Sequence, residues 1–307
     1  MALNITPVTS HREREKGFIV YPVYSRRSQG LSIGINLFTE KKVCPFDCPY
    51  CEVFPFNTGN IAGNADYSGF SLEQMEDDLR EAISAAQERK IPIMDICFSG
   101  NGEPTISPAF PDALQLAEKI RAELAPSAQL VVITNGAGLL QPLIFSLLRE
   151  FAVNYSLLKD NNVNFKQFTS VYLDNQFDLW LKLDAGTPYW YQKINRSSIQ
   201  FEKLIEKIKE FVLTSPVTIQ TMLCAIDEEY PPSDEVKAWE DLVCELDAIT
   251  KGGCGIIKKV QLYGKARAAP EDPLASALPA KYLEERSASL KRKFAERGMN
   301  VSVELYL

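Results

Sequence analysis

The sequence has little of several features that common classes of protein need. It contains one histidine, His11, so general acid–base chemistry would fall to Lys, Asp, Glu, Tyr or Cys side chains. No stretch approaches the roughly 18 consecutive apolar residues of a membrane-spanning helix. The first residues, MALNITPVTSHREREKGF, lack the apolar segment of a secretory signal peptide. These absences predict a cytoplasmic protein without a membrane partner.

An excess of positive charge is also missing. The formal net charge is −7, whereas proteins that bind nucleic acid usually carry a basic face. A nucleic-acid partner is therefore less expected, although a local basic patch would not show in the total. The composition, with 46% hydrophobic and 24% charged residues among 307, is typical of a globular protein with a sizeable core.

Cysteine is present, but its arrangement argues against a disulfide framework. The seven cysteines are an odd number, and three of them, Cys44, Cys48 and Cys51, cluster in the stretch CPFDCPYCE. In a reducing compartment such a cluster indicates metal or iron–sulfur ligation. The other cysteines are scattered singly: Cys97, Cys224, Cys244 and Cys254. Isolated cysteines of this kind are by default small buried side chains.

Short strand-like runs alternate with helical ones. The predicted strands cover residues 31–37, 93–99, 129–135, 178–184, 216–223 and 258–263, with a possible further strand at 301–307. Apolar stripes at helical spacing cover residues 70–90, 111–124, 139–151, 199–213, 234–249 and 280–297. Six such units predict an α/β fold, a partial (β/α)₆ TIM-like barrel of parallel strands with outer helices. We expect residues 1–30 to form an N-terminal extension, 31–265 the barrel, and 266–307 a C-terminal helix and extra strand packed on it.

The predicted strands alternate apolar and polar residues. In LSIGINL, Ser32 and Asn36 lie opposite the apolar residues, and in DLWLKLD, Lys182 and Asp184 lie opposite the leucines. Strands buried on both faces would be almost entirely apolar. We therefore expect a hollow barrel whose polar faces line an interior that holds water or a ligand. Half-exposed strands of an antiparallel sheet would alternate in the same way and stay an open alternative.

The three clustered thiols are too few for several common groups. A structural zinc needs four ligands, usually from a second pair of cysteines or histidines. A CPYC dithiol redox site would leave Cys44 without a role, and an electron-carrying iron–sulfur cluster needs four thiolates. Three thiolates on a four-iron cluster leave one iron open to a small molecule. The trio follows the first predicted strand, at the carboxyl end where parallel α/β folds place their sites.

The spacing C-x₃-C-x₂-C, with the aromatic Tyr50 before the last cysteine, resembles the hallmark of the radical S-adenosylmethionine (radical SAM) superfamily. The resemblance implies a [4Fe-4S] cluster on Cys44, Cys48 and Cys51 whose open iron binds S-adenosylmethionine. A reductant such as flavodoxin or ferredoxin would supply an electron to the cluster, and the reduced cluster would cleave S-adenosylmethionine. The resulting 5′-deoxyadenosyl radical would abstract hydrogen from a small-molecule, peptide or protein substrate, in chemistry of the oxidoreductase or lyase type.

A second motif follows in the order that the resemblance predicts. Gly100, Asn101, Gly102 and Glu103 come after the second strand. They match the family motif that binds the amino group of S-adenosylmethionine, with Asn101 where a glycine is common. On its own, a Gly-x-Gly loop is usually just a turn that lets the backbone approach a neighbour closely.

Further cofactor candidates lie at the ends of later strands. Thr134 and Asn135 could reach a ribose or a carboxylate, unless the Asn-Gly pair only forms a turn. Lys182 and Asp184 share an inward face, where they either pair or bind the carboxylate and the ribose of S-adenosylmethionine. The inward-facing candidates for adenine or substrate contacts on the last two strands are Gln220, Gln261, Tyr263 and Lys265.

The segments CPFDCPYCE, FSGNGEPT and WLKLDAGT resemble the corresponding motifs of a subgroup that includes the tRNA wyosine-forming enzymes and the glycyl-radical activating enzymes. This similarity spans about residues 30–265. Wyosine-forming enzymes carry a second cluster on upstream cysteines, but no cysteine precedes Cys44 here, so a tRNA substrate is less expected. Two alternatives stay open. One is an activating or modifying enzyme that acts on a protein or tRNA partner, and the other is a non-catalytic metal-binding interaction protein.

Overall fold

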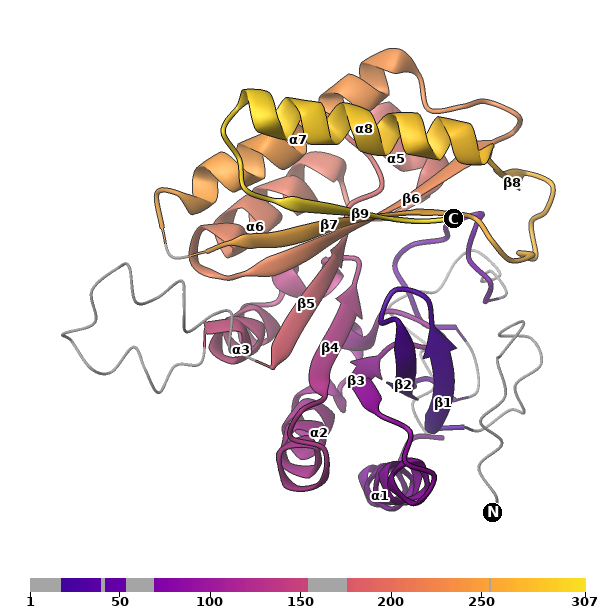
Figure 1. Ribbon diagram of the computed structural model, residues 1–307, viewed down its shortest axis with the longest axis vertical. Coiled ribbons are helices and arrows are strands. Elements are labelled where there is room, and N and C mark those ends of the chain that lie inside the picture. The colour runs from indigo at the N-terminus through magenta and orange to yellow at the C-terminus, as the bar shows by residue number, and fades with distance from the viewer. Residues whose placement is uncertain (1–17, 40–41, 54–68, 154–175, 254) are drawn as a thin grey trace.

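The computed structural model describes residues 18–39, 42–53, 69–153, 176–253 and 255–307. His11, Cys254 and most of the expected N-terminal extension lie outside the described residues. Figure 1 shows one curled sheet with helices packed around the outside of the curl. This is the mixed α/β half-barrel that the alternation of strands and helices predicts.

Six parallel strands form the centre of the sheet in chain order. They are β2 (Gly30–Ile35), β3 (Ile93–Phe98), β4 (Gln129–Thr134), β5 (Phe177–Lys182), β6 (Val217–Ile226) and β7 (Ile257–Gly264). A last strand, β9 (Ser302–Tyr306), pairs in parallel with β7. All seven were predicted from the sequence, and their parallel pairing excludes the antiparallel alternative for β2 to β7.

The helices connect these strands along the outer face. They are α1 (Leu72–Glu88), α2 (Phe110–Leu124), α3 (Pro142–Val153), α6 (Phe201–Thr214), α7 (Ser233–Thr250) and α8 (Ala280–Glu296). In α1 the Ser71 side chain caps the first turn by accepting from the Gln74 amide, and Met75, Leu79 and Ile83 are buried on one face. No helix among the described residues is long and apolar enough to cross a membrane.

Some elements were not predicted. Strand β1 (Val20–Ser25) pairs antiparallel with β2 at one edge of the sheet, within the stretch expected as an N-terminal extension. Strand β8 (Ala275–Ala277) pairs antiparallel with the end of β6, and the short helix α5 (Pro188–Ile194) follows β5. Pro22 lies inside β1, and a proline in a strand is compatible with an edge position, where its missing N–H is not needed.

The interior of the half-barrel is hollow, as the alternation predicts. Apolar residues such as Ile33, Leu179 and Leu262 belong to the core cluster. On the opposite faces, Ser32 and Lys182 line a cavity of about 290 Å³. The loops after β2, β3 and β7 line this cavity together with β1 and the turn between β1 and β2.

Candidate functional site

The cysteine loop, residues 42–53, follows β2 and passes between two other segments. Its three thiols, Cys44, Cys48 and Cys51, are free and half-buried. On one side Val43 forms a parallel bridge to Gly102. On the other side the Asp47 amide donates to the carbonyl of Asn195, at 3.0 Å. Elements far apart in the sequence therefore hold the loop in place.

The glycine loop is built directly against the cysteine loop. The Val43 amide donates to the Asn101 carbonyl at 3.0 Å, and the Glu103 amide donates to the Val43 carbonyl at 2.8 Å. A Cβ on Gly102 would lie 2.0 Å from the Val43 oxygen, so no other residue fits without separating the loops. Gly100 has a φ of +143°, and a Cβ there would lie 2.4 Å from Asn36 Oδ1. The two motifs are thus one backbone unit.

Glu103 ties this unit to the end of β4. Its side chain is 3% exposed, and it accepts from the Thr134 hydroxyl and the Asn135 amide, each at 2.7 Å. Thr105 donates to it as well. Burial raises the pKa of Glu103, and these hydrogen bonds oppose the rise. Oε2 accepts only the Asn135 amide among the described residues, so it keeps capacity for one more donor.

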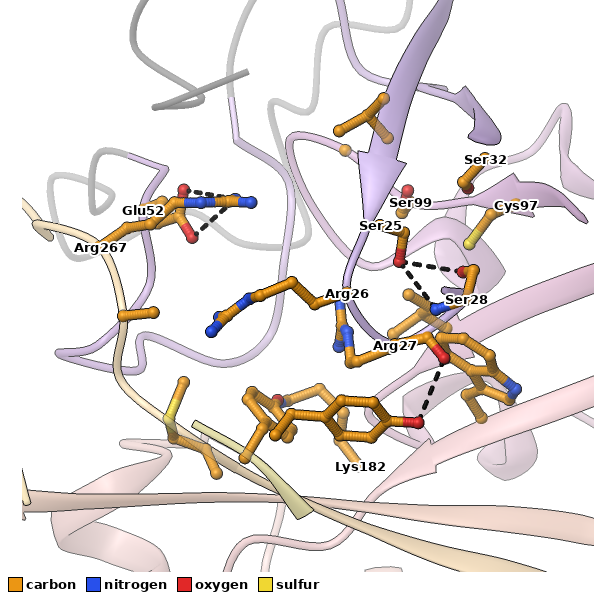
Figure 2. Close-up of a pocket in the computed structure, with 18 of the residues that line it drawn as sticks. Ser25, Arg26, Arg27, Ser28, Ser32, Glu52, Cys97, Ser99, Lys182 and Arg267 are labelled. Atoms are coloured by element: carbon orange, nitrogen blue, oxygen red, sulfur yellow. Dashed lines mark hydrogen bonds and ion pairs between the residues drawn. The ribbon is translucent and has the colours of Figure 1, made fainter. Parts of the chain in front are cut away.

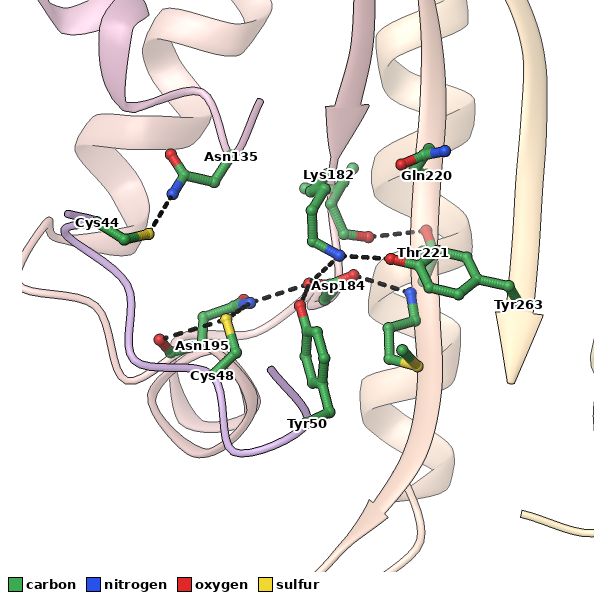
Figure 3. Close-up of polar contacts among 12 residues, drawn as sticks. Cys44, Cys48, Tyr50, Asn135, Lys182, Asp184, Asn195, Gln220, Thr221 and Tyr263 are labelled. Atoms are coloured by element: carbon green, nitrogen blue, oxygen red, sulfur yellow. Dashed lines mark hydrogen bonds and ion pairs between the residues drawn. The ribbon is translucent and has the colours of Figure 1, made fainter. Parts of the chain in front are cut away.

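Asn135 and Asn195 each place an amide donor on a cysteine sulfur. Asn135 Nδ2 lies 3.4 Å from Cys44 Sγ, and Asn195 Nδ2 lies 3.5 Å from Cys48 Sγ. Figure 3 shows both amides reaching the cysteine loop from different parts of the barrel. Hydrogen bonds to ligand sulfurs are one of the means by which proteins tune an iron–sulfur cluster.

Asp184, just after β5, gathers donors from several segments. Oδ2 accepts from the Tyr50 hydroxyl and from Asn195 Nδ2, the latter at 3.0 Å, and Oδ1 accepts from the Met222 amide at 2.8 Å. Lys182 Nζ lies 3.5 Å from Oδ2. The predicted pairing of Lys182 with Asp184 is therefore present, and Tyr50, the aromatic of the cysteine motif, is attached to it (Figure 3).

The ammonium group of Lys182 is enclosed by two tyrosines. Nζ donates to the Tyr263 hydroxyl at 2.5 Å and lies 4.9 Å from the ring centre of Tyr50. Burial alone would lower the pKa of Lys182, but the charge of Asp184 and the hydrogen bond to Tyr263 outweigh it, so the pKa is raised. Lys182 is thus a fixed cation at the cavity wall.

The thiols themselves lie in a setting that favours the protonated form. Burial and the nearby Asp184 raise the pKa of Cys48 to about 11. Burial and Glu103 raise the pKa of Cys44 well above its ordinary value. Burial would lower the pKa of Lys42, but the sulfurs of Cys51, Cys44 and Cys48 raise it.

The three cysteines could serve either a single metal ion or an iron–sulfur cluster. A single metal ion with Zn–S bonds of about 2.3 Å would need sulfurs within about 4 Å of one another. The described residues contain no group of three or more His, Cys, Asp or Glu side chains placed for a single ion. A four-iron cluster takes each thiolate on a different iron. Three free, half-buried sulfurs, two of them with amide donors, fit the cluster in type and number.

Two predicted residues lie apart from the cysteine loop. Gln220 and Gln261 are fully buried and bond to each other at 2.6 Å. Gln220 accepts from Arg27, and Gln261 donates to Glu304. Their side-chain amides therefore connect β6, β7 and β9 with the turn between β1 and β2. A third candidate, on the loop after β7, makes bonds of its own: Lys265 Nζ lies 2.7 Å from Asp272.

Other site residues were not found from the sequence. No pattern in the sequence singles out Asn195, yet it is 3% exposed and contacts both Cys48 and Asp184. Arg27 belongs to the turn between β1 and β2 and enters the barrel, where it lies 5.8 Å from the Trp180 ring and 5.1 Å from the Tyr263 ring. Neither residue belongs to a sequence motif that would predict its role in the site.

Comparison with known sequences is informative over part of the chain. No family model matches. Over 143 residues, 44% of this chain, the sequence is 32% identical to a UPF0026 protein of Helicobacter pylori. A second strain of that organism has a UPF0026 protein with the same identity. The match spans only about two fifths of the length of these curated relatives, 41%.

Comparison with solved structures extends over most of the chain. SuiB of Streptococcus suis bound to S-adenosylmethionine matches 86% of this chain with a TM-score of 0.57 at 12% identity, and SuiB bound to precursor peptide SuiA matches 91% with 0.58. This chain spans about half of SuiB. A radical SAM methyltransferase from Sphaerobacter thermophilus matches 92% of this chain and 68% of its own, with a TM-score of 0.55 at 14% identity. The chain therefore has the partial TIM-like barrel fold of radical SAM enzymes.

Proposed function

We propose that the chain is a radical SAM enzyme in which Cys44, Cys48 and Cys51 hold a [4Fe-4S] cluster. The observation that carries the proposal is the backbone pairing between Val43 and Gly102. It puts the cysteine loop and the glycine loop side by side at the carboxyl ends of parallel strands, on the rim of a hollow barrel. A cofactor held by both motifs would face that cavity, because Cys51, Gly100 and Gly102 line it.

A bound cluster of this kind supplies the electron that cleaves S-adenosylmethionine, so that a 5′-deoxyadenosyl radical can take hydrogen from a substrate. The chain's own residues then bind and orient. The backbone of Gly100 to Glu103, with the free capacity of Glu103 Oε2, would accept the ammonium group of S-adenosylmethionine. Lys182, a buried cation, would take its carboxylate.

Other candidate residues have a supporting role in this proposal. Thr134 and Asn135 hold Glu103, and Asn135 also donates to Cys44. Asp184 already accepts from Tyr50, Asn195 and Met222, so we infer that it positions Tyr50 and Lys182 and does not bind a ribose. Tyr263, bonded to Lys182, would contact the bound cofactor from the opposite wall.

The substrate and the electron donor are proposed by class. The barrel of residues 31–265 would be the catalytic unit, with a flavodoxin or ferredoxin as its reductant. SuiB shares the fold and was solved with a precursor peptide, so a peptide should be tested beside small molecules. Membership in the subgroup of wyosine-forming or activating enzymes, with a tRNA or protein substrate, stays a prediction.

Anaerobic reconstitution tests the proposal. We expect about four irons per chain and cleavage of S-adenosylmethionine to methionine and 5′-deoxyadenosine after reduction with dithionite. Cys48→Ala should lose both, because an iron loses its protein ligand. Cys244→Ala is the matched control, since Cys244 is buried on α7, outside the cysteine loop. Iron content and product formation are measured on the same samples.

Two outcomes would contradict the proposal. Iron binding without any cleavage of S-adenosylmethionine under reducing conditions would leave an iron–sulfur protein of another kind. One zinc and no iron after anaerobic purification would favour the alternative from a different class, a metal-binding interaction protein. In either case the fold would stand and the radical chemistry would not.

A further inference from the structure

The cavity carries more positive charge than the proposed cofactor explains. Its described lining residues include four cationic side chains, Arg26, Arg27, Lys182 and Arg267, and one carboxylate, Glu52. Lys182 is compensated by Asp184, so three guanidinium groups and one carboxylate remain, in a chain whose net charge is −7. A cavity so much more basic than its protein indicates an anionic ligand.

Two of the four cations already have other partners. Lys182 belongs to the Asp184 and Tyr263 network and is the proposed partner of the cofactor's carboxylate. Arg27 lies between the rings of Trp180 and Tyr263 and donates to Gln220 at 3.1 Å, so it forms the floor of the cavity. The charges that remain for a ligand are Arg26 and Arg267.

Arg26 lies at the exposed mouth of the cavity, in the turn between β1 and β2. It donates to a backbone oxygen of Leu307. Among the described residues, no Asp or Glu side chain lies within ion-pair distance of it, although the charge of Glu52 acts on it. A guanidinium group has five N–H donors, so most of them stay available. Figure 2 shows the side chain extending into the space on the side of the cavity where Arg267 and Glu52 lie.

Arg267 comes from the loop after β7 and is held by Glu52. Nη1 lies 3.3 Å from both Glu52 oxygens, and both side chains are partly exposed, at 30% and 23%. Distances of this length describe a weak ion pair, since good charge-assisted bonds measure about 2.7–2.9 Å. An incoming anion could therefore exchange with Glu52 at modest cost. Glu52 directly follows Cys51, which lines the same cavity.

The arginines repel one another. Burial and the charges of Arg267 and Arg27 lower the pKa of Arg26, although the group stays a cation. Like charges placed around one space are stabilised when an anion fills it.

We propose that Arg26 and Arg267 bind an oxyanion of the substrate, a carboxylate or a phosphate, at the mouth of the cavity. Glu52 holds Arg267 in place until the anion replaces it. The cavity of about 290 Å³ is the one that the proposed cofactor would face, so only the part of the substrate that carries the anion would enter it. Assigning the anion to a substrate rests on the proposed function, but the anion site itself does not.

Calorimetric titration of the reconstituted protein with pyrophosphate and with succinate tests the site and separates phosphate from carboxylate. Arg26→Ala and Arg267→Ala should each weaken binding of the preferred probe about tenfold, since each removes a charge-assisted contact. Glu52→Gln should strengthen it, because the competing carboxylate is gone. A misfolded protein would not gain affinity. Arg292→Ala, exposed on α8, is the matched control and should bind as the unchanged protein does.

The same titrations are repeated with saturating S-adenosylmethionine. Binding that persists, with the same pattern among the variants, supports a separate substrate anion. If S-adenosylmethionine displaces the probes and Arg26→Ala weakens its affinity, the arginines serve the carboxylate of the cofactor and the proposal is overturned. Equal binding by all variants, or none by the unchanged protein, also overturns it. Probe binding in a protein that never cleaves S-adenosylmethionine would leave the anion site standing while the proposed function fails.

Discussion

At the scale of single residues, Asn195 connects parts of the site that come from different regions of the sequence. Its side-chain amide reaches Cys48 Sγ and Asp184 Oδ2, and its backbone oxygen accepts from the Asp47 amide. One buried residue after α5 therefore positions both the cysteine loop and the carboxylate that holds Tyr50. This makes it a positioning residue, because nothing in its chemistry acts on a substrate directly.

Replacing Asn195 with alanine should expose this role. The change leaves Asp184 with one donor fewer in a buried setting, and it should lower the free energy of unfolding by about 1–3 kcal/mol. Urea unfolding measures the loss. Asn300→Ala, at an exposed position before β9, is the control and should change stability little. Equal stabilities for the two variants would show that the Asn195 amide is not part of the structural network.

Such residues mark the limit of prediction from the sequence. The three cysteines and the Gly100 to Glu103 stretch could be found because their spacing is a motif read along the chain. Asn195, Arg27 and Arg26 could not, because each meets its partners only after distant elements pack. Gln220 and Gln261 were predicted to face inward; they are buried and bond to each other, but the sequence could not show that Arg27 donates to Gln220.

At the scale of elements, the pairing of the cysteine and glycine loops is the most constrained contact of the site. Gly102→Ala would put a Cβ 2.0 Å from the Val43 oxygen and 2.8 Å from the Phe38 ring. Backbone cannot yield as a flexible side chain does, so the loops must separate. We expect a loss of about 1–3 kcal/mol in the free energy of unfolding and less iron per chain after reconstitution.

Gly252→Ala provides the comparison for that experiment. A Cβ on Gly252 would meet only the Ile249 oxygen, at an ordinary 3.5 Å, so the change should be tolerated. Unfolding curves and iron content are measured for both variants. If Gly102→Ala binds as much iron as Gly252→Ala, the glycine loop does not fix the cysteine loop and the proposed site loses its main support.

Elements with a strong period were the predictable part of the fold. The central strands and the outer helices were placed from apolar spacing alone, because tertiary packing agrees with their local pattern. Strand β1 was missed because Pro22 and its half-exposed residues weaken the pattern at an edge. Helix α5 and β8 are too short for a period to show. The β1 edge of the barrel therefore had to come from the structure, whereas β9 at the other edge was predicted.

At the scale of the whole molecule, the two edges of the half-barrel meet at the mouth of the cavity. Strands β1 and β9 are the two ends of the sheet order. The Tyr306 hydroxyl lies 3.2 Å from the carbonyl oxygen of Arg27 and 2.6 Å from Glu304, and Arg26 donates to Leu307. The turn that carries the proposed anion site is thus attached to the opposite end of the sheet. Its position depends on closure of the barrel.

Tyr306→Phe tests this dependence. The variant keeps the ring but loses the hydroxyl that reaches both the turn and Glu304, so the free energy of unfolding should fall by about 0.5–1.5 kcal/mol. Amide hydrogen exchange should become faster in residues 25–30, because the turn loses its contact with β9. Tyr230→Phe is the control, since Tyr230 is half exposed and packs by its ring against Tyr282. Unchanged exchange in the turn would mean that β9 does not hold the cavity mouth, and the arginines there would owe their position to β1 and β2 alone.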